Sequence, residues 1–512
     1  MTQRNIVNII TFIRSVEHRA SFSIVEPIEE QIKLIDRYGF KATFLLQYDA
    51  LLTPEYINLM KALDPNRYEI GLWYEIPRPL CEACGLPWTS ELLWDPRCFC
   101  DFPVGYTKEQ REMLIDEAFR KFKEVFGYYP RSMGSWFYDT HTIRHIEAKY
   151  GLDALCNCKE QYGTDGYTLW GGYYGQGYYP AKKNVFLPAQ NKENQINIPL
   201  FRMLGSDHVY QYDFGMTVSE GARRVQEVIT LEPAYTAKGG GGNPKWVDWY
   251  LKENYNGECL SFSYAQAGQE NSFGWAKIKD GLNDQFAKFK ALSDAGNLTI
   301  ETLGETGRWY KESYPLTPAS TITAHSAYDD PNKKSAWYCS KRYRINLYSD
   351  ENGLRIRDLQ LFDEQYADPY EETVCTGNDA AYYALPVIDG NLYSGNGIYA
   401  GVYPLVNGEK MAAGEMHFTK IDDDTAEISF TNGENTVNFL LTETSVKVKC
   451  DAAFELKIAI GKTEMLPQIT KNDGKHIDFL SRGKDYSLCL EKGEITGNGI
   501  LPTDGEVLLT FA

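Results

Sequence analysis

The sequence lacks an apolar segment long enough to cross a bilayer, and it lacks a run of lysine or arginine that would favour a membrane surface. The apolar stretch at residues 6–13 is interrupted by Asn8 and Thr11, and no small-residue cleavage site follows it. It therefore predicts a buried strand rather than a signal peptide. Eleven cysteines without a secretion signal are typical of a reducing compartment. We expect a cytoplasmic, bacterial-type protein with no membrane partner.

Positive charge is scarce. The chain has 52 basic against 70 acidic residues and a formal net charge of −18. Such a protein is repelled by phosphate backbones, which argues against nucleic acid as a partner. Two catalytic signatures are also missing, because no serine lies in a nucleophile elbow and no glycine-rich loop joins a strand to a helix. The glycines at 239–242 predict a mobile loop instead.

Up to about residue 310, strand-like runs alternate with helical stretches such as 27–38 and 108–126. This alternation predicts parallel strands joined by crossover helices. The number of strands favours a closed barrel over an open sheet, so the predicted fold class is α/β, with a (β/α)7–8 barrel over residues 1–314.

From about Pro315 the long helical patterns vanish and short alternating strands replace them, among them YRINLY, GLRIRDLQLF and TVNFLLTE. Turn signals separate these strands, at Asp389-Gly390, Asn407-Gly408 and Asn432-Gly433. The pattern predicts an all-β sandwich over residues 315–512 that serves the barrel as an accessory domain.

Acidic side chains follow most of the predicted barrel strands. Because the active site of such a barrel lies at the carboxyl ends of its strands, these side chains should meet at one mouth. The ordinary alternative is that about half of them are solvated charges on the rim. Paired carboxylates are the groups that cleave glycosides, one as proton donor and one as nucleophile or base. The candidates are Glu17, Glu75, Asp139, Asp207, Glu232 and Glu270.

The segments KATFLL, YEIGLW and GYYPRSMGSW resemble the second, third and fourth strand regions of the glycoside hydrolase/deacetylase superfamily. That superfamily joins polysaccharide deacetylases, glycoside hydrolase family 57 and family 38 alpha-mannosidases. Residues 134–139 resemble the family 57 motif Gly-x-Trp-x-Pro-Glu and the family 38 segment with an Asp after a Trp. Both resemblances imply that Asp139 is the nucleophile.

Residues 269–275 resemble the family 57 motif Asp-x-Glu-x-Phe-Gly-His-Trp. Gln269 occupies the position of the family's acid/base, and Glu270 lies beside it. The resemblance implies Glu270 as acid/base, with Asp207 or Glu232 as substitutes. Aromatic rings stack on the flat faces of sugars. The expected substrate-binding residues are Glu17, Glu75, Trp73, Trp136, His141, Trp170, Tyr210, Gln269 and Trp275.

The deacetylases hold a divalent metal with an Asp-Asp pair after the first strand and a His-x-x-x-His pair after the third. Here the first strand leads to Arg14, Glu17 and His18, and the third leads to Glu75 without a histidine. This donor set does not make the standard deacetylase site. Glu17, His18, Asp139 and His141 leave open a different metal site, loosely like that of family 38. We expect no cofactor to be required for catalysis.

Four cysteines fall in the segment after the third strand, as a C-x-x-C pair and a C-x-C pair. Thiolates at such spacing close tetrahedral structural zinc sites, and the alternative is four free thiols in a cytosolic loop. The predicted ligands are Cys81, Cys84, Cys98 and Cys100.

The sequence thus predicts a glycoside hydrolase that acts on an oligosaccharide or glycoside with a pair of carboxylates. The alternatives are a carbohydrate deacetylase and a non-catalytic glycan-binding protein on the same barrel.

Overall fold

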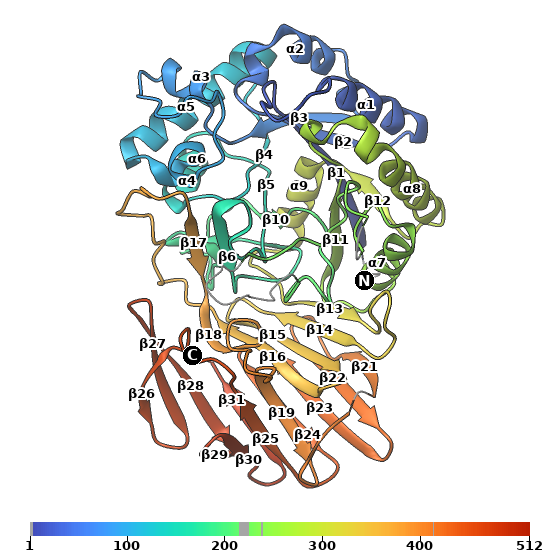
Figure 1. The fold of residues 1–512 in the computed structure, drawn as a ribbon, viewed down its shortest axis with the longest axis vertical. Helices are drawn as coiled ribbons and strands as arrows, with labels where there is room; N and C mark the ends of the chain where they lie inside the picture. Colours follow the sequence, from blue (N-terminus) through green and yellow to red (C-terminus); the bar gives the residue numbers. More distant parts are fainter. Residues whose placement is uncertain (1–3, 215–224, 237–238, 413, 512) are drawn as a thin grey trace.

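The computed structural model describes residues 4–214, 225–236, 239–412 and 414–511. An α/β part built on a curled sheet lies above an all-β part, and the two pack against each other (Figure 1). Within the described ranges, none of the helices combines the length and the apolar composition that a bilayer span requires.

The first part is built on a nine-stranded sheet in the order β11-β1-β2-β3-β4-β5-β10-β7, with β12 beside β1. The strands from β11 to β10 pair in parallel, whereas β7 runs antiparallel to β10. The sheet curls into a half-barrel whose end strands are β11 and β7. Its members are β1 (Arg4–Ile13), β2 (Ala42–Leu46), β3 (Tyr68–Trp73), β4 (Ser132–Gly134), β5 (Ala154–Asn157), β7 (Gly177–Tyr178), β10 (Leu200–Arg202), β11 (Phe262–Ala267) and β12 (Thr299–Glu301).

The helices begin and end where local chemistry dictates. Thr107 and Gln110 form a capping box at the start of α5, and Gly127 ends the helix with a φ of 85°. The bounds of α5 are those that the sequence predicts. The helices are α1 (Glu26–Tyr38), α2 (Pro54–Lys61), α3 (Arg78–Ala83), α4 (Cys98–Asp101), α5 (Lys108–Phe126), α6 (Thr140–Lys149), α7 (Pro244–Tyr255), α8 (Trp275–Asp294) and α9 (Leu303–Ser313).

The barrel-type fold is confirmed, but one predicted strand is wrong. The segment EVITLEP, residues 227–233, forms only an isolated bridge between Ser206 and Thr230. It runs on towards the mouth of the half-barrel instead of joining the sheet, so Glu232 approaches the mouth from a loop. The small antiparallel pair β8 (Pro180–Ala181) and β9 (Asn184–Pro188) lies outside the main sheet.

The second part consists of two antiparallel sheets, which confirms the predicted β-domain. One sheet has the order β13-β14-β15-β16-β19-β25-β30-β29, with β18 beside β16 and β20 beside β19. The other has the order β21-β22-β23-β24-β31-β28-β27-β26. The bounds that matter below are β13 (Ser320–Ala324), β14 (Lys334–Cys339), β15 (Tyr343–Asp350), β16 (Gly353–Leu361), β18 (Leu385–Asp389), β22 (Ala426–Asn432), β23 (Asn435–Thr442), β27 (His476–Ser481) and β28 (Lys484–Lys492).

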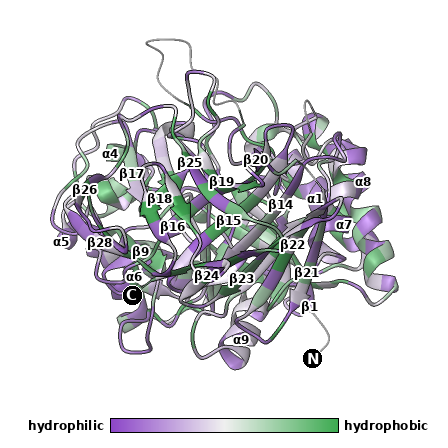
Figure 2. Cartoon of the chain, turned by 90° about the horizontal axis from the view of Figure 1, so that it is seen from below, coloured by the Kyte–Doolittle hydropathy of each residue, from purple (hydrophilic) through white to green (hydrophobic). Residues whose placement is uncertain are grey.

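The two sheets differ in how their faces are buried. Strand β23 alternates buried and half-buried residues, as a strand with one solvated face should. Every residue of β15 and β16 is buried, because this sheet is covered by the half-barrel on one face and by the other sheet on its second face. Seen from below, hydrophilic and hydrophobic residues are interspersed along the strands of the β-domain (Figure 2).

An extension of the β-domain, residues 362–384, returns to the barrel part. Within it, β17 (Ala380–Tyr383) pairs in parallel with β6 (Tyr167–Trp170), which lies in the barrel part of the chain (Figure 1). The backbone N–H of Cys375 also donates to the carbonyl of Val104 at 2.7 Å. The two parts of the chain therefore share main-chain hydrogen bonds as well as side-chain contacts.

Candidate functional site

A cavity of about 410 Å³ opens at the carboxyl ends of the parallel strands. The residues that line it follow β1, β3, β4, β5, β10 and β11, so the curl of the sheet brings six separate chain segments to one place. Its walls carry the aromatic rings that a sugar-binding groove needs. These rings belong to Phe22, Trp94, Phe102, Trp136, Tyr167, Tyr235 and Phe273.

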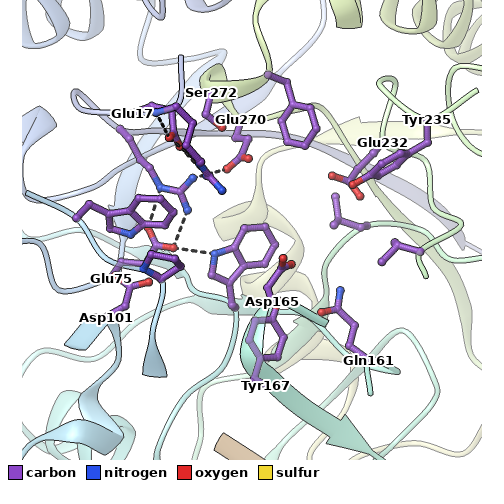
Figure 3. Close-up of a pocket in the computed structure, with 18 of the residues that line it drawn as sticks. Glu17, Glu75, Asp101, Gln161, Asp165, Tyr167, Glu232, Tyr235, Glu270 and Ser272 are labelled. Carbon is purple, nitrogen blue, oxygen red and sulfur yellow. Dashed lines mark hydrogen bonds and ion pairs between the residues drawn. The ribbon is translucent and has the colours of Figure 1, made fainter. Parts of the chain in front are cut away.

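One side of the cavity is organised by Glu75, which immediately follows β3. Its two oxygens accept hydrogen bonds from Arg14 at 2.7 and 2.9 Å, from Trp136 Nε1 at 2.7 Å and from Gln47 Nε2 at 2.6 Å. With four donors on two oxygens, this carboxylate is saturated. Glu75 therefore positions Arg14 and Trp136 and keeps no free oxygen lone pair aimed at a ligand (Figure 3).

Arg14 links this side of the cavity to Glu270, which follows β11. The guanidinium Nη1 donates to Glu270 Oε2 at 2.8 Å, and both side chains are buried. Burial disfavours the charged guanidinium, but Glu75 and Glu270 outweigh burial and raise the pKa of Arg14. Burial also disfavours the charged form of Glu270, which raises the pKa of this carboxyl, and the charge of Arg14 opposes that rise. Glu270 is thus a buried carboxylate held beside a permanent cation.

Glu232 lies on the opposite side of the cavity, beside Tyr235 (Figure 3). Its partners are neutral: Gln269 Nε2 donates to Oε1 at 3.1 Å, and Thr230 Oγ1 donates to Oε2 at 2.9 Å. Burial raises the pKa of Glu232 to about 7, against the effect of these two hydrogen bonds. This carboxyl can therefore carry a proton near neutral pH, as a general acid must.

Glu17 reaches the rim of the cavity but is fully engaged. Arg19 binds both of its oxygens at 2.7 Å, and the backbone N–H of Arg19 adds a further hydrogen bond at 2.9 Å. Burial favours the neutral acid, but the hydrogen bonds from Arg19 outweigh it and lower the pKa of Glu17. Glu17 stays ionised as part of a local ion pair.

Two further carboxyls in the cavity escaped the sequence analysis, Asp101 and Asp165. Asp101 ends the short helix α4, and Asp165 lies in a turn before β6. Neither comes directly after a strand of the half-barrel, and the rule about strand ends therefore missed them. Arg14 was noted only as a departure from a metal motif, although it is the cation around which the site is built. The residues Gly163 to Gly166, two glycines around an Asp, were the available signal of a special turn.

Asp139, the predicted nucleophile, lies outside the residues that line the cavity, so the structure does not bring it together with Glu232 and Glu270. It is the N-cap of α6, where its Oδ1 accepts the backbone N–H of Thr142 at 3.0 Å. The same oxygen accepts Arg111 Nη1 at 3.1 Å. After β4 the chain turns away from the mouth through Ser135 to Tyr138, so that Trp136 faces the cavity and Asp139 begins the helix.

Asp207 and His141 also lie outside the cavity lining. The carboxylate of Asp207 accepts the backbone N–H groups of Val209 and Tyr210 and the indole N–H of Trp246, all within 2.8 Å. Because these three donors occupy its oxygens, Asp207 has a structural role as the anchor of a turn. His141 pairs with Glu112 at 2.9 Å across the surface between α5 and α6.

Of the aromatic residues predicted to stack on sugar, the structure places only Trp136 in the cavity lining. Trp73 is buried and stacks on Phe12, with ring centroids 3.9 Å apart. Trp170 is buried at the junction with the β-domain, where its Nε1 donates to Asp389 at 2.7 Å. Tyr210 donates to Asp329 at 2.7 Å, away from the mouth. Trp275 begins α8 beside the cavity without lining it, and Gln269 acts indirectly by holding Glu232.

The four cysteines of the predicted zinc site make separate contacts. Cys81 contacts the hydroxyl of Tyr106 at 3.3 Å, and Cys100 contacts that of Thr89 at 3.6 Å. Cys84 and Cys98 each face a backbone carbonyl, of Met113 and Gly166. Across the ranges that the structure describes, no group of three or more His, Cys, Asp or Glu side chains is arranged to hold a metal. The geometry thus fits the alternative of separate thiols.

The donor set at the mouth does not fit the metal of the deacetylases. The positions after β1 and β3 hold Arg14 and Glu75, and their ion pair at 2.7 Å fills the space between these strand ends. A guanidinium cannot ligate a metal, since it has no acceptor, and its charge repels one.

No protein-family model matches the sequence, and no curated protein matches it either. Among solved structures, the chain is similar to a candidate glycoside hydrolase/deacetylase from Parabacteroides distasonis, with a TM-score of 0.58. The two are 16% identical, and the match covers 75% of this chain and 91% of that one. This chain shares the glycoside hydrolase/deacetylase fold. Because the match exceeds the length of the barrel part, the likeness extends into the β-domain.

Two weaker likenesses do not bear on the fold. One is to a candidate polysaccharide deacetylase from Mycobacterium smegmatis, with a TM-score of 0.37, 12% identity and coverage of 62% of this chain and 93% of that one. The other is to a family 57 branching enzyme from Thermococcus kodakaraensis, with a TM-score of 0.32, 9% identity and coverage of 60% and 71%.

Proposed function

We propose that this protein is a glycoside hydrolase in which Glu232 is the general acid and Glu270 is the nucleophile or base. The observation that carries the proposal is the contrast between two carboxyls on opposite sides of one aromatic-walled cavity. Glu232 has only neutral partners, and burial raises its pKa to about 7. Glu270 has the cation of Arg14 at 2.8 Å. Such a contrast is how one site keeps one acid protonated and another ionised.

The reaction follows from these roles. Glu232 donates its proton to the oxygen of the departing group while the bond from that oxygen to the anomeric carbon breaks. The carboxylate of Glu270 supplies the electron pair for the anomeric carbon, directly or by taking a proton from an attacking water. Arg14 holds Glu270 in place, and its charge opposes the rise that burial causes in the pKa of Glu270. This pair of carboxyls, beside strand ends where the Arg14–Glu75 ion pair does not fit a metal, favours glycoside cleavage over metal-dependent deacetylation.

The decisive test compares leaving groups in Glu232→Gln. Without its acid, the enzyme should lose about a thousandfold or more in kcat on glycosides with alkyl leaving groups. It should lose far less on dinitrophenyl glycosides, whose leaving group departs without a proton. The substrates are a panel of nitrophenyl and alkyl glycosides that differ in sugar and in anomer.

Three outcomes would contradict the proposal. An equal loss on both leaving groups would remove Glu232 from the role of acid. Release of acetate from acetylated sugars, abolished by a chelator, would identify a deacetylase instead. Binding of oligosaccharides with no turnover of any substrate would make the protein a glycan-binding module.

A further inference from the structure

Asp165 has an unusual backbone for a residue at the mouth of the cavity. Its φ is 53°, in the left-handed region that residues other than Gly, Asn and Asp seldom adopt. Leu204, which also lines the cavity, shares this conformation with a φ of 55°. Strained backbone of this kind persists only where the surrounding structure imposes it, and it gathers at functional sites.

The surroundings of Asp165 do impose its position. The Sγ of Cys98 faces the carbonyl of Gly166 at 3.4 Å, and Thr164 Oγ1 donates to the carbonyl of Gln226 at 2.8 Å. A side chain at Gly166 would meet the carbonyl of Asn378 at 3.1 Å, so the β-domain extension closes over the turn. Strand β6 follows at once and pairs with β17 of that extension. Two parts of the chain therefore cooperate to hold one carboxylate at the cavity.

Among the described residues that line the cavity, acids outnumber the cations that could neutralise them. Arg14 pairs with Glu75 and Glu270, and Arg19 pairs with Glu17. Of these described lining residues, the remaining acids are Asp101, Asp165 and Glu232, and the remaining cation is Lys277, whose Nζ lies 4.5 Å from the ring of Phe273.

These three acids differ in how far burial favours their neutral form. Burial raises the pKa of Asp101 well above its ordinary range, with its Oδ1 buried and without a hydrogen-bond partner among the described residues. Burial also raises the pKa of Glu232, to about 7. Asp165 is the most exposed of the three, and Arg19 and Arg14 oppose the rise that burial causes in its pKa. It is the acid of the three that stays open to a ligand.

Aromatic rings surround this open carboxylate. Tyr167 lies beside Asp165, Tyr235 lies across the cavity beside Glu232 (Figure 3), and Trp136 lines the same cavity. A carboxylate among aromatic faces is the arrangement that binds an ammonium group, by ion pairing and by attraction to the ring faces. We propose that the substrate is an amino sugar glycoside and that Asp165 binds its protonated amino group. This inference rests on the proposed glycosidase function for the reaction, but not for the binding.

The experiment measures binding without turnover, by titration calorimetry of the full chain. The probes are glucosamine, galactosamine and mannosamine, each against its parent hexose and its N-acetyl derivative. We expect at least one amino sugar to bind about tenfold more tightly than both neutral counterparts, which is the advantage of one charge-assisted hydrogen bond. Asp165→Asn should bring the three affinities together. Asparagine also tolerates the left-handed region, so the turn should keep its shape.

The control is Glu55→Gln, at the exposed start of α2, which changes the net charge equally and should keep the preference. Turnover then separates roles: Asp165→Asn should raise KM for amino glycosides more than it raises KM for neutral glycosides. Equal binding of amino and neutral sugars would overturn the proposal. So would a kcat loss shared by all substrates, which would make Asp165 a catalytic acid. If no glycoside is cleaved while amino sugars still bind, the proposed function fails and this inference stands.

Discussion

Two buried arginines mark two regions of this molecule that use the same chemistry for different ends. Arg344 of β15 lies at the junction of the half-barrel and the β-domain, where it pairs with Glu160 and with Asp358 at 2.8 Å. Arg14 lies at the cavity, where it pairs with Glu75 and Glu270. Each guanidinium thus bridges two carboxylates.

The difference is in what surrounds the pairs. At the junction, the nearby Asp389 is also occupied, by Trp170, Tyr212 and Gln360. Side chains from both parts of the chain close over the pairs, and no residue of this cluster lines the cavity. In the cavity, Glu232, Glu270 and Asp165 border open space. A charged cluster that is enclosed by both parts of the chain fixes the junction of the two domains. An excess of acids around an open cavity is instead equipped for ligand chemistry.

The largest effect should follow from Glu270→Gln, which tests whether the open cluster is catalytic. Glutamine keeps the shape and a hydrogen bond to Arg14 but cannot act as nucleophile or base. We expect kcat on any cleaved glycoside to fall by about a thousandfold or more, whereas the melting temperature should fall only moderately because Arg14 keeps its ion pair with Glu75. Steady-state kinetics and a thermal melt measure both. A variant with near-native kcat would remove Glu270 from the mechanism.

Arg344→Met should act on stability instead, because it leaves Glu160 and Asp358 buried without a cation. Breaking a buried pair by removing one partner costs about 3–5 kcal/mol. Urea unfolding gives the free-energy difference. Arg120→Met on the exposed face of α5, which also removes two ion pairs, should cost less than about 1 kcal/mol. Equal losses in the two variants would show that the junction cluster does not stabilise the fold.

The pH profile should reveal the acid of the cavity. Because Glu232 must be protonated to act and its pKa is raised to about 7, kcat/KM should fall about tenfold per pH unit above that value. The sign is that of a required acid: activity is present below the pKa and lost as pH rises through it. Glu232→Gln should abolish this limb of the profile, and a limb that persists in the variant would belong to another group.

Asp139→Asn should have the smallest effect on turnover, with kcat within about twofold of the native value, since asparagine caps a helix as well as aspartate does. Stability should fall, because Arg111 loses the charge of its carboxylate partner. The measurement is kcat beside a thermal melt. A loss of turnover comparable to that of Glu270→Gln would restore Asp139 as the nucleophile that the resemblance implied.

The comparison also shows how far the sequence reaches. Helix α5 was predicted to the residue because its cap and its terminating glycine are local signals. Glu17, Glu75, Glu232, Glu270 and Trp136 were all predicted at the mouth and all line the cavity. They follow strands or strand-like runs, and the position of strand ends is readable from the chain.

The errors arose where a side chain's surroundings come from distant segments. Trp170, which lies in an aromatic run at residues 167–179, was expected to bind substrate. Instead, most of the run is covered by the β-domain, and Tyr174 stacks on Trp337 with centroids 3.7 Å apart. Likewise, the alternation in GLRIRDLQLF is that of a strand with a wet face, yet Arg357, Asp358 and Gln360 are buried against the half-barrel. The sequence shows that one face of the strand is polar, but only the packing of the two parts of the chain determines whether that face meets solvent or buried partners.

By itself, the sequence determined the order of the elements, the change from α/β to all-β near residue 315, and the acids that the strand ends deliver to one mouth. These follow from local periodicity, caps and turns, whose energies depend on neighbours along the chain. The tertiary structure alone decided which acids stay open. Arg14 saturates Glu75 because the sheet places the carboxyl ends of β1 and β3 on either side of β2, and Asp165 reaches the cavity because β17 returns to pair with β6. The charge and reach of a carboxyl depend on burial and on partners that are hundreds of residues away, and only the folded chain supplies them.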